Sequence, residues 1–340
     1  MSNEKRPIPT AFTRQFAADY ENWSGVGRHY EALARALASR IREASPDARN
    51  VLEIGTGTGN SAAVLLEQLP DIILFGAEPG EFLELAVAKW RNDDSVANFF
   101  NSSISSSHPY SEEIAQRLAP HRERLYLLKE TGEKLSFVDE SLDAIAMCQV
   151  FHWFKESQDV ALEEMRRVLK PGGIIVFDES GAQFDFGSSK DEQELNGRFI
   201  HFHPFARLFR NNLNEELLRN GHEPITVPSS PGTFSYQFTQ DSLQKLYAQH
   251  GFEFIPTSAG SPYSVTYRPD PVEKIIVHEK TAHMRLMASS NPLLRNPEYV
   301  DEMIERVMHD TLHTWNDEEN KNFEEKYGAT AATFVARKNR

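Results

Sequence analysis

Residues 51–60 read VLEIGTGTGN, and this short stretch decides the fold. It begins with three apolar residues around one acid, the pattern of a short buried strand. Glycine then occupies alternate positions: Gly55, Gly57 and Gly59. Because glycine has no Cβ, the backbone can bend sharply there or approach a ligand closely. Asn60 and Ser61 are residue types that cap helices. The stretch therefore predicts a strand, a tight turn and a capped helix, an arrangement that binds ligands at the carboxyl ends of the strands in open α/β sheets.

The spacing of the glycines separates two kinds of nucleotide-binding turn. A dinucleotide fingerprint, G-x-G-x-x-G, requires its third glycine at position 60, where this chain has Asn60. The alternating form, with Glu53 two residues before the first glycine, resembles the first motif of the class I S-adenosylmethionine (SAM) methyltransferases. The resemblance implies that Glu53 lies near the methionine amino group of the cofactor. The turn residues that it implies around the cofactor are Gly55, Thr56, Gly57 and Gly59. A plain strand, turn and helix without a cofactor is the alternative interpretation.

A helix over residues 61–68 and a second buried strand over residues 71–77 follow the turn. Glu78 and Pro79 come directly after this strand, and Glu78 stands about 25 residues after Glu53. In adenosine-binding βαβ units, an acid at about this interval accepts hydrogen bonds from both ribose hydroxyls. We therefore predict that Glu78 and Pro79 contact the cofactor. The alternative is that Glu78 is an ordinary surface carboxylate.

The next part of the chain is less regular. Residues 91–122 are polar and serine-rich at their centre, which predicts a loop or insertion. A third strand is predicted over residues 124–128, and Glu130, Thr131 and Gly132 follow it. Many sequences of the resembling family carry Gly-Asp-Ala near this point, with the acid reaching the adenine amino group. This chain departs from that pattern, so adenine recognition is expected to rest on Glu130, Thr131 or a backbone amide. Thr131 and Gly132 are predicted to lie beside the cofactor.

The order of motifs continues through a fourth and a fifth strand. Strands are predicted over residues 141–147 and 174–178, with CQVFHWF at 148–154 and a helix over about 158–169 between them. This order resembles the small-molecule methyltransferase family that includes the ubiquinone/menaquinone and trans-aconitate methyltransferases, and the resemblance covers residues 50–178. The matching residues are His152, Trp153, Phe154, Ala161, Leu162, Glu164, Arg167, Val168, Leu169, Lys170, Pro171, Gly172 and Gly173.

The chemistry of methyl transfer indicates what the site has to supply. Transfer from a sulfonium is an in-line displacement, so the protein holds the nucleophile about 3 Å from the methyl carbon and excludes water. A carboxylate acceptor needs no base because it is ionised at neutral pH, whereas a hydroxyl, phenol, thiol or amine gains from one. His152 follows the fourth strand and titrates near neutral pH, so it is the candidate catalytic base. The alternative is that His152 and Trp153 only shape the wall of the substrate pocket. Gln149 is predicted to lie beside the cofactor.

An aromatic arm precedes the first strand. Its aromatic residues are spaced four, four and three apart and would share one face of a helix: Phe12, Phe16, Tyr20 and Trp23. If the arm covers the cofactor pocket, Tyr20 and Trp23 contact the substrate. The alternative is that the aromatic residues simply dock on the core.

The resemblance implies an α/β fold with a Rossmann-like, seven-stranded class I methyltransferase sheet, helices on both faces and a largely helical lid. The last two strands are expected to be a reversed pair. The predicted parts are the aromatic arm and a helix at 1–49, the SAM-binding core at 50–180, a lid insertion at 181–239, a core helix and strand at 240–257, a mostly helical lid at 258–328 and a final core strand at 329–340. Substrate specificity is expected to reside in the lid. Inside it, phenylalanines recur at roughly helical spacing beside arginines, which favours an ordinary core over an apolar substrate lid: Phe199, Phe202, Phe205 and Phe209.

Composition narrows the range of partners. The chain has 36 lysines and arginines and 50 aspartates and glutamates, which gives a formal net charge of −14. Because the basic residues form no cluster, we expect no nucleic-acid partner. A single cysteine, Cys148, excludes an intramolecular disulfide and fits a reducing compartment. With no stretch apolar enough for a signal peptide or a membrane span, we predict a cytoplasmic protein without a membrane partner. The later histidines form two pairs, His201 with His203 and His309 with His313, but they have no cysteine partner or H-E-x-x-H motif, so we predict no metal site.

Together these observations predict a SAM-dependent methyltransferase that acts on a small-molecule acceptor and releases S-adenosylhomocysteine (SAH). O-methylation of a carboxylate or hydroxyl is the first hypothesis. One alternative is methylation of protein or nucleic acid, although enzymes that methylate base amines usually carry Asn/Asp-Pro-Pro-aromatic where this chain has QVFH at 149–152. The other is a SAM-binding sensor, cyclase or isomerase on the same fold. The oligomeric state is left open.

Overall fold

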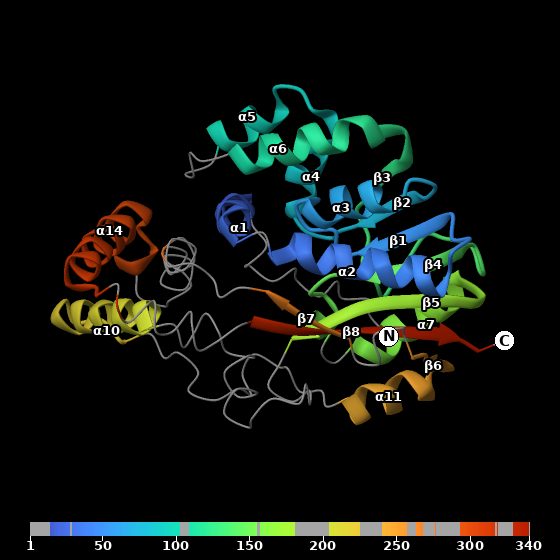
Figure 1. The fold of residues 1–340 in the computed structure, drawn as a ribbon. Coiled ribbons are helices and arrows are strands. Elements are labelled where there is room, and N and C mark those ends of the chain that lie inside the picture. The colour runs from blue at the N-terminus through green and yellow to red at the C-terminus, as the bar shows by residue number, and fades with distance from the viewer. Residues whose placement is uncertain are drawn as a thin grey trace, which may run out of the picture.

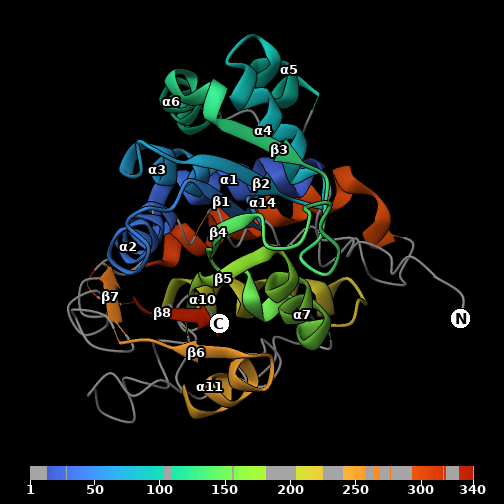
Figure 2. The same ribbon diagram turned by 90° about the vertical axis from the view of Figure 1, so that its right-hand side faces the viewer.

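The computed structural model describes residues 14–27, 29–102, 109–154, 157–180, 204–224, 240–256, 263–267, 276, 293–316, 318 and 329–339. These residues form a mixed β-sheet covered by helices on both faces (Figures 1 and 2). The strands are β1 (Asn50–Ile54), β2 (Ile73–Ala77), β3 (Leu125–Leu128), β4 (Leu142–Met147), β5 (Leu169–Ser180), β6 (Phe252–Phe254), β7 (Tyr263–Tyr267) and β8 (Ala329–Lys338). The α-helices are α1 (Arg14–Gly27), α2 (His29–Ala44), α3 (Asn60–Gln68), α4 (Phe82–Arg91), α5 (Ser95–Asn101), α6 (Pro109–Leu118), α7 (Gln158–Val168), α10 (Pro204–Arg219), α11 (Gln240–Gln249) and α14 (Pro297–Thr314). The 3-10 helices are η2 (Ala119–Arg124), η3 (Phe151–Trp153) and η6 (Leu293–Arg295).

The topology of the sheet confirms the predicted fold class. The strand order is β3-β2-β1-β4-β5-β8-β6, and β7 pairs with β8 beside this path. Strands β1 to β5 run parallel, whereas β8 is antiparallel to β5, β6 and β7. Parallel strands joined by crossovers place all of their carboxyl ends at one side of the sheet, which we call the carboxyl edge. The expected Rossmann-like sheet with a reversed last pair is therefore present, and β7 adds one strand to the expected seven.

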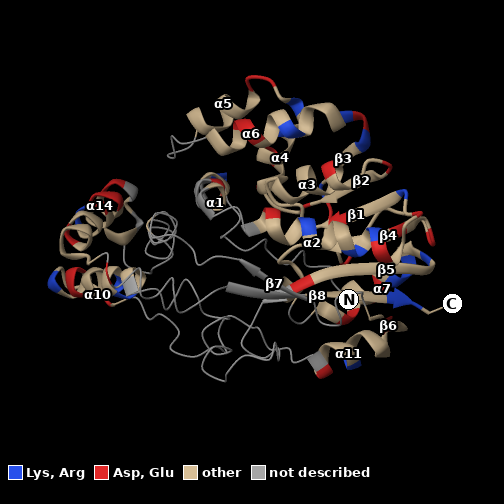
Figure 3. Ribbon diagram, viewed as in Figure 1, with Lys and Arg blue, Asp and Glu red and all other residues tan. Residues whose placement is uncertain are grey.

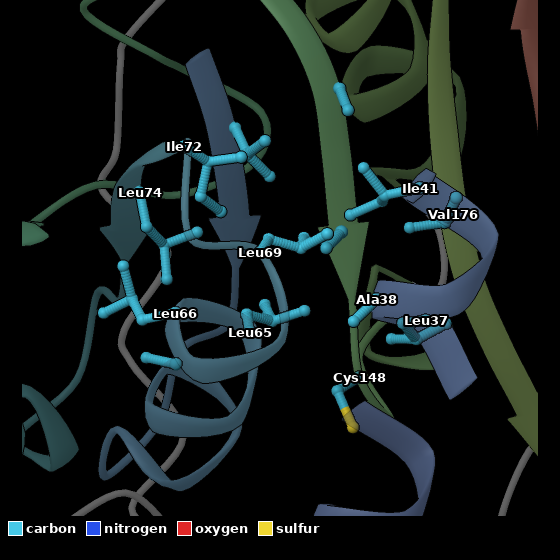
Figure 4. Packing of buried hydrophobic residues seen from close by; sticks show 14 of the residues in the cluster. Leu37, Ala38, Ile41, Leu65, Leu66, Leu69, Ile72, Leu74, Cys148 and Val176 are labelled. Atoms are coloured by element: carbon cyan, nitrogen blue, oxygen red, sulfur yellow. The ribbon is translucent and has the colours of Figure 1, made fainter. Parts of the chain in front are cut away.

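Alternate residues of the central strands point to opposite faces of the sheet, and each face has its own core. In β1, Val51 belongs to one core and Leu52 to the other. Figure 4 shows the first core, where side chains of α2 and α3 meet those of the strands: Leu37, Ala38, Ile41, Leu65, Leu66, Leu74 and Val176. The second core lies under α7 and α11, where the rings of Phe177 and Tyr247 stack with their centroids 4.9 Å apart. Strands buried on both faces explain the almost continuous apolar runs in the sequence.

A separate apolar cluster joins α10 to α14, which lie side by side beyond the carboxyl edge (Figure 1). Phe205 and Phe209 of α10 are fully buried against α14 residues such as Val300 and Met303. This arrangement confirms the core interpretation for these two phenylalanines. Phe199 and Phe202 lie outside the described residues.

The prediction that residues 91–122 are irregular was wrong. This region contains α5, α6 and most of η2. Its polar composition hides a few apolar residues that are all buried: Val96, Phe99, Phe100, Ile114 and Leu118. Val96, Phe99 and Phe100 pack with Leu85 of α4, while Ile114 and Leu118 join the first core. Similarly, β7 lies in a region predicted to be mostly helical, because pairing with β8 decides its structure.

Charge and hydropathy add three observations about the part of the chain that the structure describes. Both α6 and α10 carry basic as well as acidic residues (Figure 3). In that part of the chain, no helix is long and apolar enough to cross a membrane. Nor do its histidines, cysteines and acids form a group of three that could hold a metal ion. His309 is exposed on α14, and the predicted pair His201 and His203 lies outside the described residues.

Candidate active site

The glycine turn joins β1 to α3 at the carboxyl edge. All three glycines have a positive φ, of 70° at Gly55, 55° at Gly57 and 86° at Gly59. At Gly55 a side chain would also clash, because an added Cβ would lie 2.4 Å from Cγ2 of Val150. Only glycine combines this backbone conformation with so close a contact. The N–H groups of Gly55 and Thr56 donate to the carbonyl oxygen of Ala77 at 2.8 and 3.2 Å, which fastens the turn to the end of β2.

The helix after the turn is not capped as the sequence predicts. Gly59 is the N-cap of α3, in the left-handed conformation, and the cap has no side-chain hydrogen bond. The Asn60 amide is engaged elsewhere, because its Oδ1 accepts from Nζ of Lys89 at 2.6 Å and its Nδ2 donates to Glu21 at 3.1 Å. The prediction that Asn60 and Ser61 cap this helix was therefore wrong, because a buried ion pair engages the Asn60 side chain and the Glu53 carboxyl engages the Ser61 hydroxyl.

Glu53, near the end of β1, is fully buried. Its Oε2 accepts a hydrogen bond from the hydroxyl of Thr56 at 2.6 Å. Burial raises the pKa of the carboxyl to about 7, although the hydroxyls of Ser61 and Thr56 oppose the rise. Its Oε1 has no hydrogen-bond partner among the described residues. A buried carboxylate oxygen without a partner is costly, and a cation that reached it would remove that penalty. The cationic amino group of SAM has the charge and the donors that this oxygen lacks.

Glu78 lies at the end of β2 and faces the same turn. Its Oε2 accepts from the N–H of Gly57 at 3.1 Å and its Oε1 from the N–H of Gly80 at 2.9 Å. Burial raises the pKa of this carboxyl, while the two backbone hydrogen bonds oppose the rise. Each carboxylate oxygen has further lone pairs, so Glu78 can still accept hydrogen bonds from the hydroxyls of a ribose. Pro79 follows it and is half-buried.

The segment after β3 makes a tight turn, in which Thr131 and Lys134 form an isolated β-bridge. Thr131 is exposed, whereas Gly132 is buried under Phe154, and a Cβ on Gly132 would lie 2.5 Å from Cζ of that ring. The Glu130 carboxylate accepts from the N–H of Ser136 at 3.1 Å. Of the three groups proposed for adenine, Glu130 is therefore engaged in its own turn, which favours Thr131 and the backbone around Gly132.

Gln149 lies two residues after the end of β4 and has a positive φ of 57°, which is uncommon for a residue other than glycine. Its N–H donates to Oδ1 of Asp178 at 2.9 Å, and its side-chain amide donates to Oδ2 of the same carboxylate. Asp178 belongs to β5 and is fully buried. A non-glycine residue with positive φ is strained, and Asp178 holds Gln149 in this conformation. The sequence analysis assigned no role to Asp178, although an acid after the apolar run of β5 was a signal that could have found it.

The first two residues of the HWF motif, His152 and Trp153, lie in η3, which begins four residues after β4 ends. Phe151 and Phe154 anchor it in the second core. His152 is half-buried and Trp153 is 50% exposed, and their ring centroids lie 5.4 Å apart. The two residues predicted to face the substrate are therefore the accessible members of this motif.

Helix α1 carries the aromatic residue Tyr20, which packs against an apolar cluster that includes Phe82 of α4. The ring of Tyr20 lies 5.6 Å from that of Tyr30 and 5.1 Å from that of Phe82, measured between centroids. Burial raises the pKa of the Tyr20 hydroxyl strongly, and the nearby Cys148 at the end of β4 adds to the rise. Tyr20 thus lies close to the carboxyl edge. The side chain of Trp23 is outside the described part of the structure.

A cavity of about 360 Å³ lies between α4, α5 and the start of α1. Its walls include Arg14, Gly80, Leu83, Arg91, Phe99 and Lys129. None of the residues predicted to bind the cofactor lines it. The predicted site is instead the surface enclosed by the glycine turn, the end of β2 and the segment after β4.

The sheet order, the alternating glycine turn and the two buried glutamates at the carboxyl edge define a Rossmann-like domain of the class I methyltransferase kind. The family described as "Methyltransferase domain" matches residues 83–177. This part of the chain is therefore similar to a methyltransferase domain.

Two curated relatives and one solved structure illustrate the similarity. The malonyl-[acyl-carrier protein] O-methyltransferase of Methylococcus capsulatus is 25% identical over 212 residues, which cover 62% of this chain and 66% of that protein. The protein of the same name from a Paenibacillus species is 24% identical over 269 residues, covering 77% of this chain and 88% of that protein. A methyltransferase from Haloferax volcanii, solved with the activator Trm112, is 14% identical with a TM-score of 0.45 and covers 98% of this chain and 100% of its own. The match to the first relative thus leaves about a third of that protein uncovered.

Proposed function

We propose that this chain is a SAM-dependent methyltransferase that transfers a methyl group to the oxygen of a small-molecule acceptor. The observation that carries the proposal is the buried Glu53, whose Oε1 has no hydrogen-bond partner among the described residues. The matching domain family and the two relatives named O-methyltransferases support the reaction class.

The cofactor would be held by residues from four segments, at the ends of β1, β2, β3 and β4. Glu53 would bind the amino group, Glu78 with Pro79 the ribose, and the segment at Thr131 and Gly132 the adenine. Gln149 would lie on one side of the cofactor. The glycine turn would lie against its other side, with the residues Gly55, Thr56, Gly57 and Gly59. When bound, SAM supplies an electrophilic methyl group on a sulfonium. The protein then has to position the acceptor oxygen, exclude water and prevent any competing nucleophile from reaching the methyl group.

The acceptor would approach between η3 and α1. We propose that Tyr20, Trp23, His152 and Trp153 form this wall. The names of both relatives point to the carboxylate of an acyl group as acceptor, and such a group is already ionised at neutral pH. With a carboxylate, His152 would act as part of the wall. With a hydroxyl, His152 would accept the proton that the acceptor loses.

The lid and the cellular setting belong to the same proposal. Substrate choice would reside in residues 181–239 and 258–328, of which α10 and α14 lie beyond the carboxyl edge (Figure 1). A net charge of −14 makes a polyanionic nucleic acid a poor substrate, so a small molecule is proposed. The single buried Cys148 fits a reducing compartment, and we propose a cytoplasmic protein.

The test is an assay for methyl transfer with defined acceptors. The purified chain is incubated with methyl-labelled SAM and either a malonyl thioester, the matching acetyl thioester or a hydroxylated acyl thioester. The proposal predicts SAH together with a labelled ester from the malonyl compound, and no labelled product from the acetyl compound, which lacks a free carboxylate. Labelled ether from the hydroxylated compound alone would assign the hydroxyl as acceptor. Binding of SAM without SAH formation from any acceptor, including a metabolite extract, would support the sensor, cyclase or isomerase alternative instead.

A further inference from the structure

A buried ion pair lies beside the glycine turn, outside the set of residues proposed to touch the cofactor. Glu21 of α1 pairs with Lys89 of α4, and their side chains are 1% and 0% exposed. Burial lowers the pKa of Lys89, while the neighbouring Glu21 opposes this change. Two charges removed from water are costly unless their remaining hydrogen-bonding positions are satisfied.

The Glu21 carboxylate has partners on three other elements. Its Oε2 accepts from the hydroxyl of Thr58 at 2.7 Å and from Nδ2 of Asn60 at 3.1 Å. Its Oε1 accepts from the hydroxyl of Ser111 in α6 at 2.8 Å. Lys89 in turn donates to Oδ1 of Asn60 at 2.6 Å. Both residues from the turn region, Thr58 and Asn60, are themselves buried.

This geometry makes the shape of the glycine turn depend on the docking of α1. The Glu21 carboxylate binds both side chains that flank Gly59, those of Thr58 and Asn60. Glu21 lies on α1, 37 residues before Thr58 in the sequence. Hydrogen bonds to a buried charge are stronger than those between neutral groups. Because Lys89 also bonds Asn60, the turn cannot rearrange without disturbing the ion pair.

We propose that Glu21 is a positioning residue, which holds Thr58 and Asn60 so that the glycine turn keeps the conformation that accepts the cofactor. Lys89 neutralises Glu21 and orients the Asn60 amide. This inference rests on the proposed function, because it assigns Glu21 a role in binding SAM. It also makes α1 part of the cofactor site, because Glu21 would act there through Thr58 and Asn60.

Four variants of the full chain separate positioning from simple stabilisation. Glu21→Gln removes the charge, and Thr58→Val removes the hydroxyl that the turn donates to it while keeping the side-chain shape. Ser111→Ala is the matched control, because it removes a hydroxyl from the same carboxylate on the side of α6. Glu67→Gln is a second control, since it breaks the bidentate pair with Arg117 between α3 and α6 at 2.7 and 2.9 Å without touching the turn.

The measurements are the Kd for SAH by calorimetry and the KM and kcat for SAM where turnover is observed. Glu21→Gln and Thr58→Val should each raise the Kd and the KM about tenfold with a small change in kcat. Ser111→Ala and Glu67→Gln should lower the melting temperature but keep the Kd within about twofold of the unmodified chain.

The outcomes distinguish this inference from the proposed function. If the unmodified chain binds SAH but Thr58→Val keeps its Kd, or if Ser111→Ala weakens binding as much as Thr58→Val, the carboxylate is structural and the inference is wrong. If the unmodified chain binds no SAH, the proposed function itself is wrong. Should Glu21→Gln fail to fold, the comparison of Thr58→Val with Ser111→Ala still decides the question.

Discussion

The carboxylate of Glu78 accepts a hydrogen bond from the backbone N–H of Gly57 at 3.1 Å. This contact ties the end of β2 to the middle of the glycine turn that follows β1. Because the other oxygen of Glu78 accepts from the N–H of Gly80, one side chain organises the backbone on both sides of the proposed ribose position. The proposed cofactor site is therefore held together by an acid that also belongs to it.

Replacing Glu78 with glutamine tests this double role. The amide has one acceptor oxygen, so its NH₂ group must face either the Gly57 or the Gly80 N–H. We expect a loss of roughly 1–3 kcal/mol in the free energy of unfolding and a larger Kd for SAH. Glu84→Gln is the control, because this acid lies on α4 and is 54% exposed. A Glu78→Gln protein that binds SAH as well as the Glu84→Gln control would contradict the assignment.

The raised pKa of Glu53 predicts how stability depends on pH. Burial raises this pKa from 4.5 to about 7, so over this range the folded chain retains a proton that the unfolded chain has released. The contribution of Glu53 to the free energy of unfolding therefore falls as the pH rises from 4.5 to about 7, by roughly 3 kcal/mol at most. Glu53→Gln cannot ionise, so its stability relative to the unmodified chain should increase over the same range. Urea unfolding at several pH values measures this difference, and a difference that stays constant would contradict the prediction.

The same titration predicts the pH dependence of cofactor binding. The amino group of SAH favours the ionised form of Glu53, so below about pH 7 binding must first expel a proton. The Kd for SAH should fall as the pH rises from about 6 to about 8. Calorimetry in buffers with different heats of ionisation would detect the released proton. A Kd that varies with pH in the same way for Glu53→Gln would assign the effect to another group.

Alanine in place of Gly55 tests the turn with a matched control elsewhere in the chain. Gly55 and Gly172 have similar φ values, of 70° and 79°, but an added Cβ at Gly172 has no atom within 4 Å. Both substitutions strain the backbone by about 1–2 kcal/mol. Only Gly55→Ala adds a clash with Val150 and a displaced turn, so it should lose more stability and also lose SAH binding. Equal losses of stability with SAH binding intact would show that the turn tolerates a side chain.

Two buried or partly buried aspartates allow a comparison of the two ends of the sheet. Asp178 accepts from the N–H of Gln149 at the carboxyl edge, and Asp143 accepts from the N–H groups of Arg49 and Asn50 at the opposite end, at 2.9 and 2.8 Å. Asp178→Asn and Asp143→Asn should each destabilise the fold by roughly 1–3 kcal/mol. Only Asp178→Asn should raise the Kd for SAH, because it releases the strained Gln149. The Kd of both variants for SAH is measured by calorimetry. Equal Kd values would contradict a role of Asp178 in the cofactor site.

The local pattern of the sequence was sufficient to predict the parallel strands and the turn. Apolar runs identified β1, β2 and β4, and alternating glycines identified a turn in which three glycines have a positive φ. Glu53 and Glu78 were predicted as site residues because their signal is local: each lies at or next to the end of a buried strand. Both glutamates are buried at the turn in the structure.

Features that depend on distant partners could not be predicted. Glu21 lies on a polar helix, and nothing nearby in the sequence indicates that it pairs with Lys89. Asn60 is a residue type that often caps helices, but its side chain is hydrogen-bonded to that ion pair instead. The helix α5 was missed because its buried residues, such as Phe99, are few and surrounded by polar ones. In each case a tertiary contact outweighs the local preference.

The most direct test of the central claim is calorimetric titration of the purified chain with SAH, beside the Glu53→Gln variant. If the glycine turn and the two buried glutamates form a cofactor site, the unmodified chain binds one SAH per chain, and the variant binds it about tenfold or more weakly because it has lost the charge that pairs with the amino group. No binding of SAH to the unmodified chain, or the same Kd in both proteins, would contradict the account.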